Sequence, residues 1–437
     1  MKISLRRSMR VMTVLLLLTV MVGAFGLSAL AERPAKNVIL LIGDGMGFGQ
    51  LTAARIVKGG SLYMDGFSYS GHASTYPNDP TGTWVTDSAA AGTALATGVK
   101  TYNGAISVDV DKQPLKTILE AAQEAGKSTG LVTTTRITHA TPAVFAAHSL
   151  TRGAEADIAA EMLNHNVTVL LGGGRKFFPE NLITDAKYDG YAYVETKEDM
   201  DAVEKGKLMG LFATSHMSYE LDRSTTQEPS LAEMTQKAIE ILNQNPDGFF
   251  MMVEGGRIDH ASHGHDAAAA VYDTLAFDKA VGVALNFALQ NRDTLIVVTA
   301  DHETGGMSVG GYGVYNFRPE LLKKVRGSYE DGIAPKFTLD NIPEIMADYA
   351  GITDLTADEL NTIVQAVKNR DKNKYAPANA AADIVSKRAF VGWTSGGHTG
   401  VDVPVFAYGP HAEDFAGYID NTAINQFMVK ALGLSLR

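Results

Sequence analysis

The sequence predicts an α/β fold, a three-layer sandwich in which helices cover both faces of a mainly parallel central sheet. Six short runs of aliphatic and β-branched residues are apolar almost throughout, which is typical of strands buried on both faces. Helical stretches alternate with these runs, as they do where crossover helices connect parallel strands. A charged, helical stretch near the C-terminal third interrupts the alternation.

The predicted elements follow one another along the chain after an N-terminal segment. The strands are Asn37–Ile42, Ser128–Thr133, Val167–Leu171, Gly248–Val253, Thr294–Thr299 and Pro404–Tyr408. The helices are Ser88–Thr97, Leu115–Ala125, Ile158–Asn164, Ser230–Asn243 and Ala268–Leu289. The sequence has no internal repeat or low-complexity segment, and its length is ample for a buried core.

Residues from about 311 to 387 lose the strand pattern and become charged and helical. Thr356 with Glu359 forms a capping box, and Asn341 precedes a second helix start. Glycine pairs flank the region on both sides. We interpret it as a helical insertion into one domain that spans residues 32–437. Whether it is a solvated cap, a lid or a dimer contact stays open.

The first 31 residues have the features of a secretory signal peptide. All four charged residues among the first ten are basic, and an apolar run follows from Val11 to about Leu27. Ala29-Leu30-Ala31 is the small-x-small pattern that signal peptidases cut. We therefore predict export of the chain to a secreted, periplasmic or cell-surface location. The alternative is an uncleaved membrane anchor, because the apolar run is nearly long enough to span a bilayer.

Charge and cysteine content narrow the possible partners. Cleavage would remove four basic and no acidic residues, which changes the formal net charge from −11 to −15. Such a chain is poorly suited to nucleic acid or anionic membranes, so any phosphate site must supply its own local positive charge. The sequence has no cysteine, which excludes disulfides and a lipid-modified cysteine anchor. A homodimer remains possible.

Residues that can bind metal ions follow four of the predicted strands. They are Asp44, His139 with Thr141, Glu254 with Asp259 and His260, and Asp301 with His302. In open α/β sheets, ligands bind beyond the carboxyl ends of the strands. Any one of these residues could be part of a turn, but together they indicate a multinuclear metal site with oxygen and nitrogen ligands.

The spacing of these residues supports a metal site. Asp259 and His263 are four residues apart, so on a helix they lie on one face and can share an ion. His398 lies in a glycine-rich loop before the last predicted strand, where a ligand is more plausible than a core histidine. The remaining histidines considered have no carboxylate at useful spacing, and we expect them to be structural. They are His72, His148, His165, His216 and His411.

Ser88 is the candidate nucleophile. It opens a helix of alanine, glycine and threonine, where a serine is most often only an N-cap. The same position presents helix N–H groups to an anion, and small neighbours allow phosphate and metals to approach. A serine hydroxyl needs a base or a metal to become nucleophilic. No Ser-His-Asp order is evident, so we expect activation by a metal.

Several motifs carry a resemblance to a known family. They are Val85–Thr93, Ile42–Gly47, Thr97–Gly104, Val253–His260 and Thr299–His302. Together they span nearly the whole mature chain in the family's order, and the chain resembles the alkaline phosphatase family of exported, metal-dependent phosphomonoesterases. The resemblance implies hydrolysis of small phosphate monoesters to an alcohol and inorganic phosphate through a phosphoserine intermediate.

The resemblance assigns the metal-binding residues to three sites. They are Asp259, His263 and His398 for one zinc ion; Asp301, His302, Ser88 and a bridging Asp44 for the second zinc ion; and Asp44, Thr141 and Glu254 for a third ion, usually magnesium in the family. The resemblance also places Arg152 where the family holds phosphate with arginine. A guanidinium can bind two phosphate oxygens at once, although Arg152 could be only a surface charge.

The sequence departs from part of the family at His139 and His260. Some bacterial members carry Asp and Lys there, whereas others, including animal members, carry histidine at both. Histidine removes a negative charge near the third ion, so zinc or cobalt could replace magnesium. We therefore expect His139 as a softer ligand at the third ion and His260 as a substrate-binding residue.

Two other functions stay open. A related metal-dependent hydrolase could act on phosphodiesters or sulfate esters, although sulfatases usually need a modified Cys or Ser in another motif. A non-catalytic phosphate- or metal-binding protein would not need Ser88 as a nucleophile. The resemblance implies that Ser88 attacks between two zinc ions, with Arg152 neutralising charge on the phosphoryl group.

Overall fold

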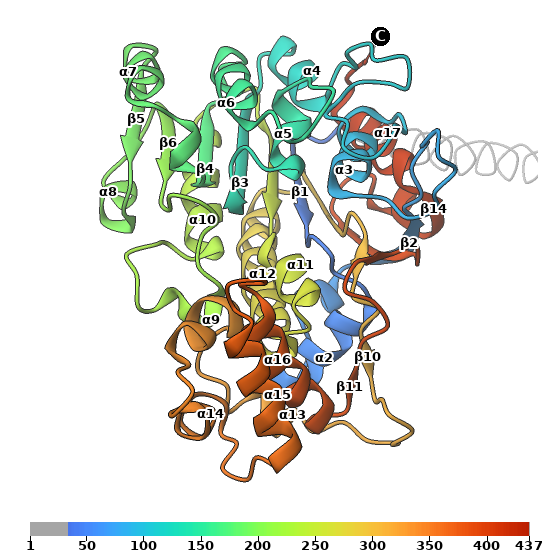
Figure 1. Ribbon diagram of the computed structural model, residues 1–437. Coiled ribbons are helices and arrows are strands. Elements are labelled where there is room, and N and C mark those ends of the chain that lie inside the picture. Colours follow the sequence, from blue (N-terminus) through green and yellow to red (C-terminus); the bar gives the residue numbers. More distant parts are fainter. Residues whose placement is uncertain (1–33, 437) are drawn as a thin grey trace, which may run out of the picture.

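The computed structural model describes residues 34–436 and has a ten-stranded sheet at its centre (Figure 1). The strands are β1 Asn37–Ile42, β2 Tyr69–Ser74, β3 Ser128–Arg136, β4 Val169–Gly173, β5 Tyr191–Val194, β6 Lys207–Leu211, β7 Phe249–Glu254, β8 Thr294–Thr299, β13 Val403–Tyr408 and β14 Gly417–Asp420. Their order is β14-β2-β13-β8-β1-β7-β3-β4-β6-β5. Only β13 runs antiparallel to its neighbours in this sheet, so the predicted fold class is confirmed.

Helices pack on the sheet in two groups. One group includes α4, α5 and α17, and the other includes α10 and α12, which pack against each other. The helices are α2 Phe48–Lys58, α3 Ser88–Thr97, α4 Ile118–Glu124, α5 Ala140–Ala146, α6 Glu155–Asn164, α7 Glu180–Tyr188, α8 Lys197–Asp201, α9 Glu220–Arg223, α10 Leu231–Leu242, α11 Arg257–His263, α12 Ala267–Gln290, α13 Pro319–Leu322, α14 Ile342–Ala350, α15 Ala357–Lys368, α16 Ala376–Arg388 and α17 Asn421–Leu432. The central strands β1, β7 and β8 are buried at every residue, as their unbroken apolar runs predict.

The region from Pro319 to Arg388 contains α13, α14, α15, α16 and the short turn η3 (Tyr329–Ile333). It has a hydrophobic core of its own, which also takes in residues of α2 and α12. The predicted capping box at Thr356 and Glu359 is present at the start of α15. That residues 311–387 are an insertion into the core domain stays a proposal.

Two short two-stranded sheets lie beyond the central one. β9 (Glu303–Thr304) pairs with β12 (His398–Thr399), and β10 (Ser308–Val309) pairs with β11 (Val391–Gly392). The first of these brings the glycine-rich loop of His398 back to the end of β8. The predicted signal peptide, residues 1–31, lies outside the described residues. Across residues 34–436, no helix combines the length and apolar character that crossing a membrane requires.

Candidate metal centre

The central strands end level with one another, so the polar residues at and beyond their ends lie at one edge of the sheet. Ile42 at the end of β1 is in register with Glu254 of β7 and with Thr299 of β8. Gly45, just beyond β1, has a positive φ of 71°, and a Cβ there would lie 2.8 Å from Thr304 Oγ1. Glycine therefore lets the end of β1 approach the opposite side of the site closely.

A first group of metal-binding side chains comes from α11 and β12. Nδ1 of His263 lies 2.7 Å from the carbonyl oxygen of Gly396, and Nδ1 of His398 lies 2.9 Å from that of Thr86. A carbonyl only accepts, so both rings donate from Nδ1, and each ring has a lone pair on Nε2 when it is neutral. The two Nε2 atoms are 3.2 Å apart and lie 3.4 and 3.6 Å from the carboxylate of Asp259. Lone pairs that face one another at this distance fit a cation between them.

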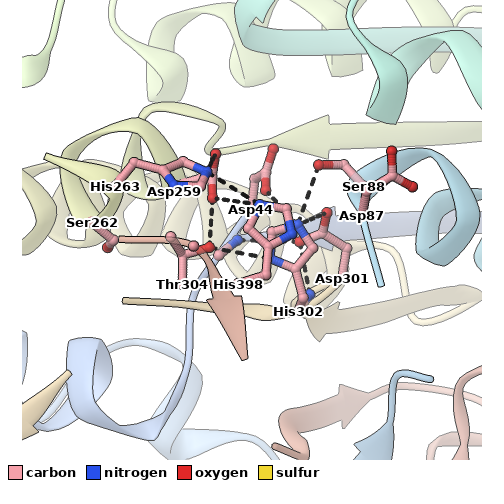
Figure 2. A network of polar contacts seen from close by, with 12 residues as sticks. Asp44, Asp87, Ser88, Asp259, Ser262, His263, Asp301, His302, Thr304 and His398 are labelled. Carbon is pink, nitrogen blue, oxygen red and sulfur yellow. Dashed lines mark hydrogen bonds and ion pairs between the residues drawn. The ribbon is translucent and has the colours of Figure 1, made fainter. Parts of the chain in front are cut away.

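A second group comes from the ends of β1 and β8 (Figure 2). The hydroxyl of Thr304 donates to Asp259 at 2.5 Å, so it accepts from Nδ1 of His302, 3.2 Å away. Nε2 of His302 therefore carries a lone pair. It lies 3.2 Å from Oδ2 of Asp301 and 3.5 Å from Oδ1 of Asp44. Thr304 thus orients a ligand of each group, as outer hydrogen bonds do at metal sites.

Ser88 is the first residue of α3, but it does not cap the helix. The side chain of Asp87 is the cap, and it accepts a hydrogen bond from the backbone N–H of Ala90 at 3.0 Å. The alternative in which Ser88 is only an N-cap is therefore wrong. The Ser88 hydroxyl instead lies 3.2 Å from Nε2 of His302 and is buried. It faces the second group directly.

A third group shares Asp44 with the second and adds Glu254 and His139. Oε2 of Glu254 accepts a hydrogen bond from the hydroxyl of Thr135 at 3.0 Å. Several other polar atoms here are buried and have no hydrogen-bond partner among residues 34–436. They are Oδ1 and Oδ2 of Asp44, Oε1 of Glu254, Oγ1 of Thr141, Nδ1 of His139 and Oδ2 of Asp301. Buried polar groups are rarely left unpaired, so the oxygen atoms of this set fit bound cations.

Burial makes two carboxylates of the centre, those of Asp44 and Asp301, hard to ionise without cations. It raises the pKa of Asp301 to about 7, and the charge of Asp259 adds to the effect. Burial likewise raises the pKa of Asp44 well above its ordinary value, assisted by Asp301. Burial also raises the pKa of Asp259, but without a cation the hydrogen bond and charge of a protonated His263 outweigh it and lower that pKa well below its ordinary value. Cations bound here would supply the missing opposite charge.

Arg152 lies at the rim of the centre. Its Nη1 donates to Oδ2 of Asp87, and its Nη2 donates to Nε2 of His139, both at 3.0 Å. Arginine cannot accept, so His139 uses its Nε2 lone pair here and carries its proton on Nδ1. Burial, followed by the charge of Arg152, lowers the pKa of His139 well below its ordinary value. In this arrangement neither nitrogen of His139 offers a free lone pair to an ion.

His260 faces the same region from α11. Nη1 of Arg257 donates to Nδ1 of His260 at 3.0 Å, which leaves Nε2–H of His260 as a donor. Burial, and then the charge of Arg257, lowers the pKa of His260 to about 3. The rings of His139 and His216 pack edge-on against His260, with centroids 5.8 and 4.3 Å away. His216 thus lies beside the candidate centre, which the sequence pattern did not indicate.

Comparison with known proteins decides the family. The family model described as alkaline phosphatase matches residues 35–434. The chain belongs to the alkaline phosphatase family. Alkaline phosphatase 3 of Bacillus subtilis is 43% identical over 429 residues, which cover 92% of this chain and 90% of that protein.

Solved alkaline phosphatases have the same fold. The cold-active enzyme of the psychrophile Shewanella sp. has a TM-score of 0.85 and 38% identity, covering 91% of this chain and 99% of that chain. A His-to-Asp mutant of the TAB5 alkaline phosphatase, with Mg bound in its M3 site, has a TM-score of 0.70 and 29% identity. It covers 92% of this chain and 99% of that chain. The present chain is accordingly an enzyme of the alkaline phosphatase family, and the predicted recognition is confirmed.

A cavity of about 320 Å³ adjoins the centre of this alkaline phosphatase family member. His260 and His263 line it on one side, and Tyr375 and Asn379 of the helical region line it on the other. Arg257, which orients His260, also forms an ion pair of 2.8 Å with Asp331 of η3. The helical region therefore contributes both to the wall of the cavity and to the surroundings of the centre.

Three of the histidines expected to be structural do have carboxylate partners, and the first is His72, which lies 3.7 Å from Asp402. His148 lies 3.1 Å from Glu161 and 3.6 Å from Glu120, and His165 lies 3.7 Å from both. The statement that no carboxylate stands at useful spacing is wrong for His165, because Glu161 precedes it by four residues. The four-residue spacing of Glu161 and His165 could therefore have indicated this pair from the sequence alone.

Proposed function

We propose that the chain hydrolyses phosphate monoesters to an alcohol and inorganic phosphate through a phosphoserine intermediate on Ser88. The observation that carries the proposal is the convergence of histidine nitrogens and unpaired carboxylate oxygens around the buried Ser88 hydroxyl. The family membership of the chain supports the same function.

The donor groups divide among two zinc ions and a third cation. One zinc would be held by Asp259, His263 and His398, and the second by Asp44, Asp301, His302 and Ser88; the third cation would be held by Asp44, Thr141 and Glu254, with His139 beside it. When bound, such cations lower the pKa of a serine hydroxyl and neutralise the charge of a phosphoryl group. The nitrogen and carboxylate donors of the first two groups suit zinc.

In the proposed reaction, Ser88 attacks phosphorus in line with the leaving alcohol, which takes up the serine proton. Its oxygen forms a bond to phosphorus while the bond from phosphorus to the alcohol oxygen breaks. Water then attacks the phosphoserine, which releases inorganic phosphate and restores the hydroxyl. Because Asp87 caps α3, the Ser88 hydroxyl is not used by the helix and stays available for this chemistry.

We propose that Arg152 binds two oxygens of the substrate phosphate. Its guanidinium lies beside the nucleophile because Asp87, the residue before Ser88, holds Nη1 at 3.0 Å. To bind phosphate as a fork, the guanidinium has to exchange its contact with His139 for the new acceptor. His260, whose Nε2–H is a donor, would contact the phosphate or a water molecule on it.

The third cation is magnesium or a softer ion such as zinc or cobalt. The TAB5 mutant that carries Asp in place of a histidine has Mg bound in its M3 site. His139 in this chain offers no free lone pair while Arg152 donates to it. We therefore propose that His139 disfavours magnesium here and that an aspartate would favour it.

A substrate panel and a trapping experiment test the proposed function. The zinc- and magnesium-supplied protein should hydrolyse p-nitrophenyl phosphate far faster than the corresponding diester or sulfate ester. With labelled phosphate at acid pH, Ser88 should become labelled. Preferred cleavage of the diester would replace the proposal by the related diesterase activity, and absence of any hydrolysis would leave a phosphate- or metal-binding protein.

We also propose export of the chain, on the strength of residues 1–31 alone. Sequencing the N-terminus of the mature protein tests whether cleavage follows Ala31 or the segment is kept as an anchor. A homodimer stays a prediction, which the mass in solution would decide.

A further inference from the structure

A second group of histidines and glutamates lies away from the strand ends, around α4 and α6. It consists of Glu120 on α4, His148 after α5, Glu161 on α6 and His165 at the C-terminal end of α6. We name these four residues the outer cluster. Their side chains are between 14% and 31% exposed, so an ion can reach them from solvent. His165 also lines a surface pocket of about 300 Å³.

In the outer cluster, the two imidazole rings lie between the two carboxylates. His148 has Nδ1 at 3.1 Å from Oε1 of Glu161 and Nε2 at 3.6 Å from Oε2 of Glu120. His165 has Nε2 at 3.7 Å from Oε1 of Glu161 and Nδ1 at 3.7 Å from Oε1 of Glu120. Each ring therefore has a carboxylate oxygen opposite both of its nitrogens.

Counting donors shows where a cation fits. A neutral imidazole has one N–H, so the two rings can satisfy only two of these four contacts. Glu161 already accepts the backbone N–H of His148 at 2.9 Å and lies 3.1 Å from Nδ1 of its ring, while the carbonyl oxygen of Leu115 lies 3.0 Å from Nε2. Of these two acceptors, the carboxylate forms the stronger, charge-assisted hydrogen bond with the single N–H of a neutral ring. If both rings donate to Glu161, then Nε2 of His148 and Nδ1 of His165 turn lone pairs towards Glu120. Three electron-rich groups then face one point.

We infer that the outer cluster binds a divalent cation of the zinc class through His148, His165 and Glu120. Ligand atoms about 2.1 Å from a common tetrahedral ion lie roughly 3.4 Å apart. The nitrogens lie 3.6 and 3.7 Å from Glu120, close to that value and to the 3.2–3.6 Å separations at the strand ends. The carbonyl oxygen of Leu115, 3.0 Å from Nε2 of His148, adds an oxygen on the same side.

Glu161 has a separate role from the three ligands. A carboxylate that accepts the outer N–H of metal-binding histidines fixes their ring orientation and makes the opposite nitrogen a better ligand. Glu161 occupies that position for both rings. The outer cluster therefore has a ligand set and an orienting carboxylate, the two features that also mark the strand-end centre.

The expected role of this ion is stabilisation. His148 follows the C-terminal end of α5, while His139 stands at the N-terminal end of the same helix. Holding His148, Glu120 and His165 together would tie the ends of α4, α5 and α6 to one another. None of these residues touches Ser88 or the strand-end ligands in the described contacts, so the ion should change stability and leave catalysis unchanged.

Metal analysis of a His165→Ala variant tests the inference. After zinc supply and gel filtration, we expect the variant to hold about one zinc ion per chain fewer than the parent, because two remaining ligands bind weakly. Phosphatase activity should match that of the parent. His72→Ala is the matched control, since His72 pairs with a single carboxylate, Asp402, at 3.7 Å and belongs to no group of three metal-binding side chains among the described residues.

Thermal unfolding supplies a second readout that does not depend on activity. After chelation and refilling of the strand-end sites, further zinc should raise Tm in the parent but not in His165→Ala or His165→Gln. The glutamine variant keeps a polar side chain of similar size. It therefore distinguishes the loss of a metal ligand from a general disruption of folding. Equal zinc content in parent and variants would overturn the inference. The inference would also be overturned if acidification raised Tm and added zinc did not. In that case two protonated histidines, rather than a metal ion, would neutralise the glutamates.

Discussion

The strand-end centre and the outer cluster use the same residue types, but burial makes them different sites. Asp44 and His302 in the centre have no exposed surface, whereas His148 and Glu161 in the outer cluster are 14% and 31% exposed. Water can solvate an outer carboxylate much more fully than the buried carboxylate of Asp44. Unpaired charge in the interior costs much more free energy than at the surface. The centre should therefore depend on its cations far more strongly than the outer cluster does.

The groups that orient the histidines differ in the same way. In the centre, the carbonyl oxygens of Gly396 and Thr86 fix the rings of His263 and His398. In the outer cluster, Glu161 performs this role through a partly exposed side chain. Backbone carbonyls cannot take a proton, so the ligand geometry of the centre is set by the fold itself. Burial and backbone contacts, rather than residue types alone, separate a catalytic metal site from a stabilising one.

The largest effect should come from Ser88→Ala. Removing the nucleophile should lower kcat by at least about 10³-fold, because no other hydroxyl contacts Nε2 of His302 among the described residues. Metal content should stay at the parent's level, since each of the three groups keeps its nitrogen and carboxylate ligands. Acid trapping with labelled phosphate checks the role directly. Label on the variant equal to that on the parent would exclude Ser88 as the nucleophile.

His398→Ala allows a direct comparison of the strand-end centre with the outer cluster. It should weaken zinc binding at the centre on the order of 100-fold or more and reduce activity, because one of three protein ligands is lost. Added zinc should restore part of the activity. His165→Ala should lose zinc without losing activity. If His398→Ala kept full zinc content and rate, the loop histidine would not belong to the centre.

Arg152→Ala should have a moderate effect on substrate binding. Losing one charge-assisted, two-pronged contact costs on the order of 2 kcal/mol, or about 30-fold. KM and the inhibition constant for inorganic phosphate should rise more than kcat falls. Arg175, a surface arginine paired with Glu195, provides the control through Arg175→Ala. Unchanged phosphate inhibition in Arg152→Ala would mean that this guanidinium does not contact the substrate.

Removal of the metal ions by a chelator should reveal how much free energy it costs to bury ionised carboxylates. In the folded chain without ions, burial raises the pKa of Asp301 to about 7, above its ordinary value. The folded state then holds the proton more tightly, so the stability from this group is complete below about pH 4 and is lost as the pH rises through 7. Zinc replaces the proton, so its effect on Tm should grow with pH.

Unfolding of the chelated protein between pH 5.5 and 8.5, with and without zinc, measures this effect. Asp301→Asn removes the titrating group and should flatten the pH dependence of the chelated protein. The prediction fails if the chelated parent becomes more stable than Asp301→Asn as the pH rises. Because the outer cluster is solvated, a chelated His165→Ala variant should follow the parent's pH profile.

The middle of the sheet could be predicted from sequence, but its margins could not. β1 and β8 have the predicted bounds, because buried parallel strands leave continuous apolar runs. The strands that were not predicted, β2, β14, β5 and β6, form the two ends of the sheet. There the residues are partly exposed, as in Tyr69–Ser74, or begin with a charge and contain glycine, as in Lys207–Leu211. Such strands lack the continuous pattern that identifies a buried one.

The candidate site shows the same division. Asp259 and His263 could be placed together by their spacing, since four residues make one helical turn. The contacts of Asp87 with Arg152, and of Thr304 with Asp259 and His302, join residues far apart in the chain. Nothing local in the sequence marks such partners. The outer cluster was missed for a similar reason, because Glu120 and His148 meet only when α4 and α5 pack.

The smallest effect should come from His139→Asp, which changes the preference of the third site rather than its presence. The aspartate would add an oxygen ligand and a negative charge beside Asp44 and Glu254, and magnesium prefers such oxygen ligands. Activity of the metal-stripped variant should therefore recover better with magnesium, relative to zinc and cobalt, than that of the parent. Titrating each protein with the three metals in turn measures the ranking.

A control variant separates ligation from charge alone. His216→Asp places a carboxylate near the same region, since the rings of His216 and His139 lie 5.4 Å apart, but His216 is not part of the third group. If only the added negative charge matters, the metal preference of both variants should shift towards magnesium. If ligation matters, only His139→Asp should do so. Identical metal rankings in the parent and His139→Asp would contradict our proposal. They would mean that His139, held by Arg152, only tunes hydrogen bonding to phosphate and water, and that the shared Asp44 and Glu254 select the third ion.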